Sequence, residues 1–270
     1  MRTALAGVAA LAALTTALVS AALVTTVSPA AAEPASQPRA HSTAHSIAPP
    51  AARRAMPGKA RFARETVRYG GQDTSSSHIE HVYELQYRLT WAGVYDGPVT
   101  GYFGDLTQAA VKRYQRRIHL PASGVADTAT WRHLIPATIR GRKHIPDACA
   151  DGSGWDACYD RTRHEVTLWR DGKPRNAWLV RGGGSDTPTR TGDFTVYYRD
   201  IDHVSGLYDS PMPYSQFFSG GQAFHGSATM VDPFTGHSHG CINMYVEDAR
   251  QLWKLTSSTK LAVHVHGAWS

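Results

Sequence analysis

The apolar residues of this chain change their spacing at about residue 145, and this change constrains the fold more than any other feature. Before that point apolar residues recur at the spacing of an amphipathic helix. After it, short runs rich in Val, Tyr, Phe and Trp alternate with Gly, Pro, Ser and Asp, which is typical of strands joined by turns. The sequence therefore predicts a helical segment followed by a mostly-β one.

Residues 78–136 predict a small all-α module of three helices. Gly93 is expected to end the first helix. The second begins at Asp105, whose spacing from Gln108 is that of a capping box, and Asp127 is placed to cap the third. The residues expected to pack these helices together are Val82, Leu85, Leu89, Val111, Tyr114, Ile118, Trp131 and Leu134.

Residues 145–270 predict a mostly-β domain, a sandwich or barrel, with one helix. Asp171-Gly172 lies between two strand-like runs and is a strong hairpin signal. The runs GDFTVYYRD, QAFHGS and LAVHVHG also have the composition of short strands. The stretch YVEDARQLWKL, which follows Cys241, is expected to be the helix.

Residues 1–32 have the pattern of a secretory signal peptide, with an early arginine, a long Ala/Leu/Val run and small residues before the expected cleavage after Ala32. The alternative is an uncleaved membrane anchor, for which the run is long enough but weakly hydrophobic. Either outcome predicts a location outside the cytoplasm. Residues 33–77 are rich in Ala, Pro, Ser, His and Arg and are expected to form a disordered basic linker.

The formal net charge of the chain is +6. A basic exported protein suits an anionic partner such as the cell wall or a membrane surface. Nucleic acid is a poor candidate outside the cell. A solvated basic tail without a partner explains the linker equally well.

The chain has three cysteines. Cys149 and Cys158 lie in the Gly/Asp-rich stretch CADGSGWDACY, which can turn back, and we expect them to form a disulfide in an oxidising compartment. Cys241 is then left over. An odd cysteine in an exported protein indicates an intermolecular bridge or a free reactive thiol.

Cys241 lies in the polar, glycine-rich stretch GHSHGCINM, close behind His237 and His239. An imidazole can take the proton of a thiol, and His225 ends a strand-like run upstream. Gly240 lets the backbone approach a substrate closely. One alternative is an inert core thiol, which the polar surroundings disfavour. Another is a zinc site of these three histidines and the cysteine, whose spacing is unlike that of structural zinc sites.

The stretch ELQYRLTWAGVYDGPVTGYFGDLTQAAVKRYQRRIHLPASGVADTATW resembles the peptidoglycan-binding domain of the PG_binding_1 type. Its Leu-Gln pair, its D-G-x-x-x-G-x-F-G turn and its V-x-x-Y-Q helix appear in that order. The resemblance implies a three-helix module that holds a catalytic partner on the wall.

The stretch FHGSATMVDPFTGHSHGCINM resembles the signature of the L,D-transpeptidase (YkuD-type) family, supported upstream by TPTRTGDFTV and MPYSQFFSGGQAFHG. The resemblance implies that Cys241 is the nucleophile and His225 its base. The carbonyl of Gly226 would orient the imidazole. His239, Gly240 and the backbone N–H of the nucleophile would build or support the oxyanion hole.

Three further residues are expected beside the substrate. Ser238 and Asn243 would shape the loop around the nucleophile, and Asn243 stands where many members of the family have Arg. Tyr214, in MPYSQFF, is a candidate residue of the cleft, although a packed aromatic explains it equally well.

The resemblance implies a two-step acyl transfer without metal or cofactor. The Cys241 thiolate attacks the carbonyl of the third residue of a wall stem tetrapeptide and D-Ala leaves. An amine of a neighbouring stem then attacks the thioester and forms a 3→3 cross-link. The family also implies acylation of Cys241 by carbapenems.

Two other functions remain open. Water could resolve the same thioester, which would make the protein an L,D-carboxypeptidase or endopeptidase. The chain could also be a non-catalytic wall-binding adaptor. In every case the expected partner is peptidoglycan at the cell wall, with a membrane contact only if the signal is uncleaved.

Overall fold

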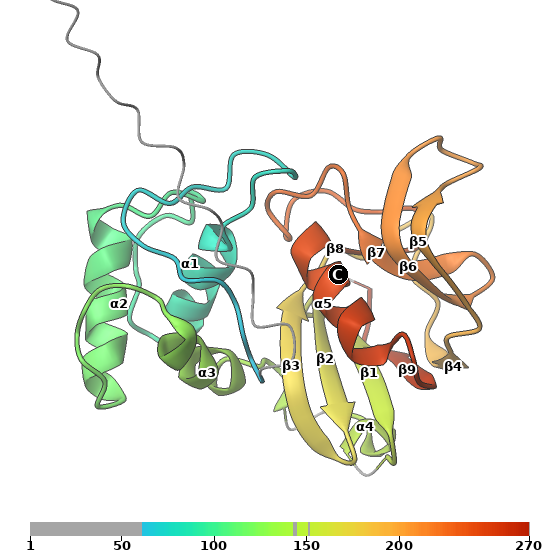
Figure 1. Ribbon diagram of the computed structural model, residues 1–270, viewed down its shortest axis with the longest axis horizontal. Coiled ribbons are helices and arrows are strands. Elements are labelled where there is room, and N and C mark those ends of the chain that lie inside the picture. The colour runs from blue at the N-terminus through green and yellow to red at the C-terminus, as the bar shows by residue number, and fades with distance from the viewer. Residues whose placement is uncertain (1–60, 143–144, 151, 270) are drawn as a thin grey trace, which may run out of the picture. The chain divides into compact units, whose positions relative to one another are not determined.

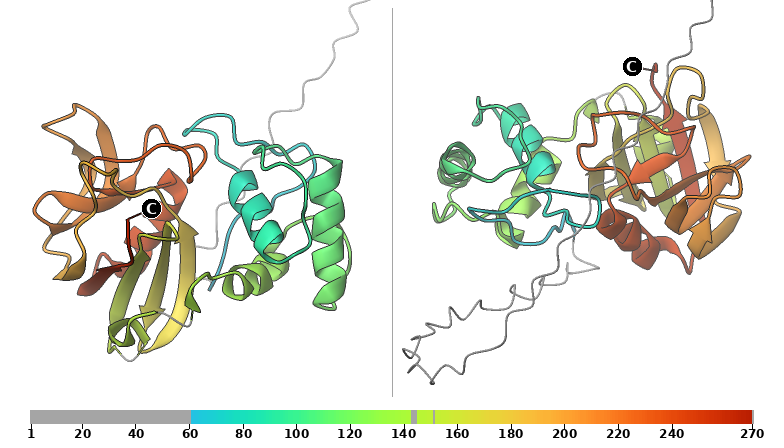
Figure 2. Two further views of the ribbon diagram at one scale, coloured as in Figure 1. Left: turned by 180° about the vertical axis from the view of Figure 1, so that it is seen from behind. Right: turned by 90° about the horizontal axis from the view of Figure 1, so that it is seen from above.

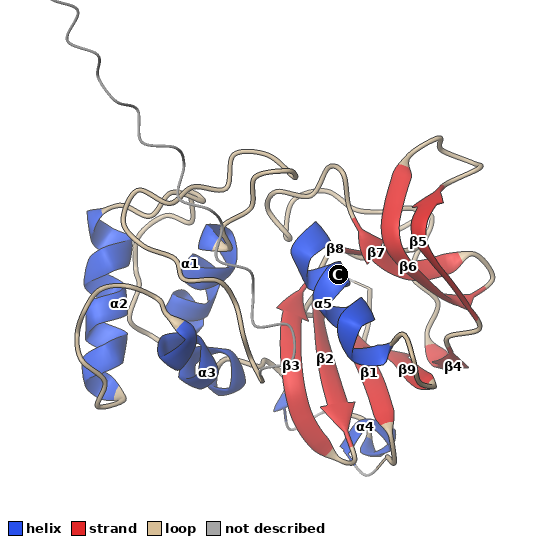
Figure 3. Cartoon of the chain, in the orientation of Figure 1, coloured by secondary structure: helices blue, strands red, loops and turns tan. Residues whose placement is uncertain are grey.

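The computed structural model describes residues 61–142, 145–150 and 152–269, and these all belong to one compact unit, Pro50–Ser270. The predicted signal peptide and the first part of the predicted linker, residues 1–60, lie outside the described residues. Figure 3 shows that helices dominate the first part of the described chain and strands the second. Within the described ranges, no helix is both long enough and apolar enough to cross a membrane.

The N-terminal part is a three-helix module, as the sequence predicts (Figure 1). The helices pack around a buried apolar cluster that includes Leu85, Val111, Tyr114 and Trp131. Their bounds are Val82–Trp91 for α1, Asp105–Arg117 for α2 and Thr128–Ala137 for α3.

The third helix is capped as expected, but the second is not. Asp127 accepts a hydrogen bond at Oδ1 from the backbone N–H of Thr130, with N and O 2.9 Å apart. In α2 the N-cap is Gly104, and no side chain caps the helix. The capping box predicted for Asp105 and Gln108 is therefore wrong, because α2 begins at Asp105 itself. The carboxylate lies inside the first turn, where it complements only the helix dipole.

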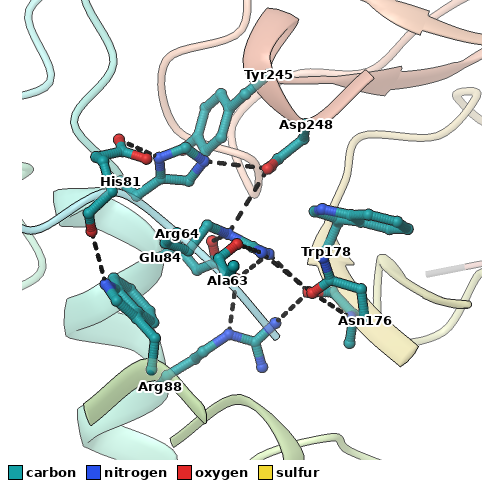
Figure 4. A network of polar contacts seen from close by, with 12 residues as sticks. Ala63, Arg64, His81, Glu84, Arg88, Asn176, Trp178, Tyr245 and Asp248 are labelled. Atoms are coloured by element: carbon teal, nitrogen blue, oxygen red, sulfur yellow. Dashed lines mark hydrogen bonds and ion pairs between the residues drawn. The ribbon is translucent and has the colours of Figure 1, made fainter. Parts of the chain in front are cut away.

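Residues 61–77 correct the linker expected over residues 33–77. Phe62 is buried in the apolar cluster of the helical module, and Arg64 is fully buried. The guanidinium of Arg64 donates to Glu84 (Nε to Oε2, 2.7 Å) and to the side chain of Asn176 (3.1 Å), as Figure 4 shows. The composition of this stretch indicated disorder because it is polar. Partners elsewhere in the chain satisfy the charge and make burial favourable.

The C-terminal part contains two sheets, seen from two further sides in Figure 2. Their inner faces and α5 share one buried cluster that includes Trp178, Phe224, Ile242 and Leu252. The mostly-β prediction with one helix after Cys241 is thereby confirmed, with the short α4 (Asp147–Ala150) in addition. The first sheet has the order β3-β2-β1-β9-β4 and the second β5-β6-β7-β8. The bounds are β1 Trp155–Asp160, β2 Glu165–Arg170, β3 Lys173–Leu179, β4 Gly192–Thr195, β5 Tyr198–Val204, β6 Pro211–Ser219, β7 Gln222–Gly226, β8 Ile242–Met244, α5 Val246–Thr256 and β9 Leu261–His266.

Two local expectations for this part are confirmed. Asp171 and Gly172 form the two-residue turn between β2 and β3, and both have positive φ, 49° and 67°. This is the backbone that a twisted hairpin favours. A disulfide joins Cys149 in α4 to Cys158 in β1. The run GDFTVYYRD forms two strands, β4 and β5, which belong to different sheets.

Candidate active site

The parallel pair of β7 and β8 brings together the two ends of the stretch FHGSATMVDPFTGHSHGCINM. His225 in β7 is the register partner of Asn243 in β8, and Cys241 directly precedes β8. Both Cys241 and His225 line a cavity of about 700 Å³. The other residues around it are Arg181, Arg190, His203, Ser205, Gly206, Leu207, Tyr208, Ser210, Pro211, Met212, Phe217, Gly220, Gly221, Gln222, Ser227, Ala228, Thr229, His237, Ser238, His239 and Asn243.

His225 is buried and held in one orientation. Its Nδ1 lies 2.9 Å from the carbonyl oxygen of Gly226. Because a carbonyl only accepts, Nδ1 carries the proton and Nε2 presents a lone pair. Burial disfavours the charged ring and lowers the pKa of His225 to about 4. The ring is therefore neutral at physiological pH and suited to accept a proton.

The sulfur of Cys241 is also neutral. Burial raises the pKa of the Cys241 thiol above its ordinary value, and the backbone N–H of Ala223 opposes this shift only in part. The thiol donates to the carbonyl oxygen of Gly221, with sulfur and oxygen 3.8 Å apart. Both groups line the same cavity and are neutral, which fits proton transfer during attack in place of a preformed ion pair.

The loop before Cys241 is fixed by its own side chain. Ser238 Oγ donates to the carbonyl of Cys241 at 2.6 Å and accepts from the backbone N–H of Gly240 at 3.0 Å. Gly240 has φ +118°, and a Cβ there would lie 2.4 Å from Nε2 of Gln222. Only glycine fits this backbone. The N–H of Gly240 already has an acceptor, which leaves the N–H of Cys241 as the better candidate oxyanion donor.

The same loop is attached to a glycine-rich segment that the sequence analysis did not select. The N–H of Ser238 donates to the carbonyl of Gly182 (2.8 Å), and the N–H of Gly184 donates to the carbonyl of Ser238 (3.1 Å). A Cβ on Gly183 would lie 2.1 Å from the carbonyl oxygen of Thr187. The run RGGGS was the available signal, because three consecutive glycines mark a close approach of backbones.

His239 is exposed and contacts another residue of the cavity wall. Its ring stacks on Tyr208, with centroids 4.4 Å apart and planes at 22°. Tyr208 lies in the loop between β5 and β6 beside Leu207, which is 86% exposed. Sequence reasoning did not identify this loop as part of the site.

The remaining expected residues divide into two groups. Ser238 and Asn243 line the cavity, and Nδ2 of Asn243 is 3.5 Å from Oγ of Ser227. Tyr214 is not among the lining residues. Its ring lies 6.3 Å from that of Trp253 and packs against the main β core, which matches the packed-aromatic alternative.

A metal-ligand arrangement occurs elsewhere in the chain. Among the described residues, the group whose ligand atoms lie within 4.8 Å of one another is His81, Glu84 and Asp248. Arg64 already balances these acids, since its Nε lies 2.7 Å from Glu84 and 3.6 Å from Asp248. The histidines around Cys241 do not form such a group within the described ranges.

Comparison with known families agrees with this architecture. Residues 79–134 match the family model of a peptidoglycan binding domain, PG_binding_1. Residues 156–265 match the L,D-transpeptidase catalytic domain, YkuD. The chain therefore combines a segment that matches a peptidoglycan binding domain with one that matches the catalytic domain of the L,D-transpeptidase family.

Individual relatives cover different parts of the chain. The spore cortex-lytic enzyme of Bacillus cereus is 42% identical over 59 residues, which are 22% of this chain and 23% of the relative. The match thus spans about a quarter of that relative's length. The L,D-transpeptidase of Stackebrandtia nassauensis is 26% identical, with a TM-score of 0.48 and coverage of 71% of this chain and 93% of that one. The L,D-transpeptidase of Xylanimonas cellulosilytica is 25% identical, with a TM-score of 0.42 and coverage of 74% of this chain and 96% of that one.

Proposed function

We propose that this protein is an L,D-transpeptidase that forms 3→3 cross-links in peptidoglycan through a thioester on Cys241. The observation that carries the proposal is the pairing of a free thiol with a buried, oriented imidazole in one cavity. Cys241 is the free cysteine among the described residues, and it lines the same cavity as His225, whose Nδ1 contacts a carbonyl so that Nε2 is the basic nitrogen. The matched family model supports the reaction class.

The first half-reaction begins with neutral groups. As the sulfur of Cys241 forms a bond to the carbonyl carbon of the third stem residue, Nε2 of His225 takes the thiol proton. Negative charge develops on the carbonyl oxygen, where the backbone N–H of Cys241 can stabilise it. The bond to D-Ala then breaks, and the leaving amine takes the proton from His225.

The second half-reaction reverses these steps with a new amine. The amine of a neighbouring stem attacks the thioester carbonyl and gives a proton to His225. The sulfur leaves and recovers that proton, and an amide joins the two stems. Thiolate is a better leaving group than the acceptor amine. The tetrahedral intermediate therefore breaks its bond to sulfur and gives the cross-link.

The helical module and the basic charge support a site of action at the cell wall. A module that matches a peptidoglycan binding domain would keep the catalytic domain close to its polymeric substrate. We infer that the protein works outside the cytoplasm, as its N-terminal sequence predicts. The same thiol should be acylated by carbapenems, which would occupy the donor position.

Product analysis of purified protein with tetrapeptide-stem muropeptides tests the proposal. We expect release of D-Ala and dimers joined between two third residues, separated by chromatography and identified by mass. Tripeptide monomers alone would identify an L,D-carboxypeptidase, since water would then resolve the thioester. If Cys241→Ala altered neither these products nor wall composition in cells, the non-catalytic adaptor would be the correct function.

A further inference from the structure

Arg181 is a buried cation in the wall of the cavity without an acidic partner. The residue is 8% exposed and lies between β3 and β4. Its Nη1 donates to the carbonyl of Thr235 at 3.0 Å, and its Nη2 donates to the hydroxyls of Thr229 at 3.0 Å and Ser227 at 3.3 Å. Its Nε is buried and has no hydrogen-bond partner among the described residues.

Other buried arginines of the chain are paired with acids. Arg64 and Arg88 are fully buried, and each places Nε 2.7 Å from a carboxylate oxygen of Glu84. Burying a guanidinium without a counter-ion is costly, so a buried arginine is normally paired. Within the described ranges Arg181 has no carboxylate within 4.0 Å, which sets it apart.

The cavity itself offers no negative charge. Its lining includes Arg181, Arg190 and four histidines but no aspartate or glutamate. Asp232 is the acid that influences Arg181 electrostatically, and both its carboxylate oxygens already accept from the hydroxyl of Tyr87 at 3.1 Å. A ligand with a carboxylate would supply the missing counter-ion at the place where the guanidinium lies.

Arg181 is also close to the reacting residues along the backbone. Its N–H and carbonyl exchange two hydrogen bonds with Asn243, both 2.9 Å long. Asn243 is two residues after Cys241, about 7 Å along an extended chain. Arg181 and Cys241 also line the same cavity, so a peptide bound there can contact both residues.

We propose that Arg181 binds a carboxylate of the donor peptide and makes the site selective for a donor in which that carboxylate is free. This inference rests on the proposed function of the same cavity. Two carboxylates of a stem tetrapeptide have the required chemistry: the terminal carboxylate of the leaving residue and the side-chain carboxylate of the third residue. Amidation of one or the other distinguishes them.

A purely structural role is the rival explanation. The hydroxyls and the carbonyl that Arg181 contacts all belong to residues 227–235. In this explanation the side chain only stabilises the conformation of that segment. Loss of these hydrogen bonds would then lower the stability of the protein and its activity toward every donor. It would not change the ratio of activities toward charged and amidated donors.

The test compares three donors: the free tetrapeptide stem, the stem amidated at its terminus, and the stem amidated on the third side chain. We expect kcat/KM of the unaltered protein to fall about 10- to 100-fold for one of the amidated donors, as for loss of a charged hydrogen bond. Arg181→Gln should abolish this preference, and Arg181→Lys should keep part of it. Arg199→Gln is the matched control, because Arg199 also contacts only neutral acceptors (Gln216, Thr256 and Thr259) and lies outside the cavity; it should keep the full preference.

Equal activity of the unaltered protein toward all three donors would overturn the role of Arg181 and leave the proposed function intact. Failure to release D-Ala from any donor would instead refute the proposed function. Calorimetric binding of the same peptides to Cys241→Ala then still decides the inference. Tighter binding of the carboxylate form supports it, and equal binding of both forms contradicts it, even if Arg181→Gln fails to fold.

Discussion

At the scale of single residues, burial keeps the proposed nucleophile and base, Cys241 and His225, neutral. The imidazole of His225 has its pKa lowered to about 4, and the thiol of Cys241 has its pKa raised. A thiolate–imidazolium pair, as in some cysteine enzymes, would need the opposite shifts. In the proposed reaction, the driving force for ionisation therefore comes from the bond that the sulfur forms to the substrate.

This arrangement predicts the pH dependence of the reaction. Because the pKa of His225 is lowered, the ring stays in its basic form as pH falls through its ordinary range near 6.5. We expect kcat/KM, which reports the free protein, to stay level down to about pH 5 and to fall with an apparent pKa of about 4. The measurement is D-Ala release at low donor concentration across pH.

Alkylation by iodoacetamide distinguishes the neutral pair from an ion pair. The rate at Cys241 should rise steadily toward alkaline pH, because the thiolate fraction grows only there. A plateau of fast alkylation at mildly acidic pH would reveal a preformed thiolate and contradict the neutral pair. Cys241→Ala supplies the background rate.

The disulfide predicts which cysteine reacts. Native, non-reduced protein should be labelled at Cys241 alone, because Cys149 and Cys158 are bonded to each other. Peptide mapping after alkylation gives the positions. Label on Cys149 or Cys158 without a reductant would mean that the disulfide does not form in the protein.

From the sequence we selected Cys241, His225 and Ser238, which line the cavity, but we did not select Arg181 or Tyr208, which line it too. The first group lies in a compact signature whose chemistry is local. Arg181 reaches the cavity through backbone pairing with β8, and Tyr208 reaches it through a hairpin loop. Such long-range pairings leave no local pattern in a single sequence.

At the scale of elements, two buried glutamines fix the turns of the helical module. Gln86 in α1 accepts from the backbone N–H groups of Thr100 and Gly101 and donates to the carbonyl of Tyr102. Gln115 in α2 accepts from the N–H of Gly124 in the same manner. Each side-chain amide thus replaces water for buried backbone groups of a turn.

The aspartates at the starts of α2 and α3 should differ in how much they contribute to the free energy of unfolding. Asp127→Ala removes the cap of α3 and should lower the free energy of unfolding by about 1 kcal/mol. Asp105→Ala removes only a favourable contact with the helix dipole and should cost about 0.3–1 kcal/mol at low salt. Urea denaturation measures both. Equal losses that persist in high salt would contradict this assignment of the caps.

The predictable elements were those whose backbone conformation suits only a few residue types. The Asp171-Gly172 turn needs two positive φ angles, and only such residues adopt them easily. The start of α2 was mispredicted because Asp105 and Gly104 both suit a helix N-terminus. In the structure Gly104 is the N-cap residue. The division of GDFTVYYRD between two sheets depends on the antiparallel pairing of β4 with β9, which local composition does not encode.

At the scale of the whole molecule, a buried ionic network joins the segment before α1 to residues of both parts (Figure 4). Arg64 contacts Glu84 in α1 and Asn176 in β3, and His81 lies 3.2 Å from Asp248 in α5. Burial opposes a charged His81, but the neighbouring carboxylates outweigh it and raise its pKa well above the ordinary value. Polar composition therefore misled the linker prediction, because these charges are satisfied only in the folded chain.

Arg64 should be a large contributor to stability. Arg64→Met leaves Glu84 and Asp248 with one fewer cation and should lower the free energy of unfolding by about 3–5 kcal/mol. Arg61→Met is the matched control, since Arg61 is exposed and its change should stay within about 0.5 kcal/mol. If chemical denaturation gave equal losses for both variants, the network would not hold residues 61–77 in the fold.

The central claim is that Cys241 carries the acyl group. Intact-mass spectrometry of protein quenched during turnover of a tetrapeptide stem, without an acceptor amine, tests it most directly. We expect a mass increase equal to the stem acyl group after loss of D-Ala, located on Cys241 and absent in Cys241→Ala. Release of D-Ala by Cys241→Ala at an undiminished rate would contradict it.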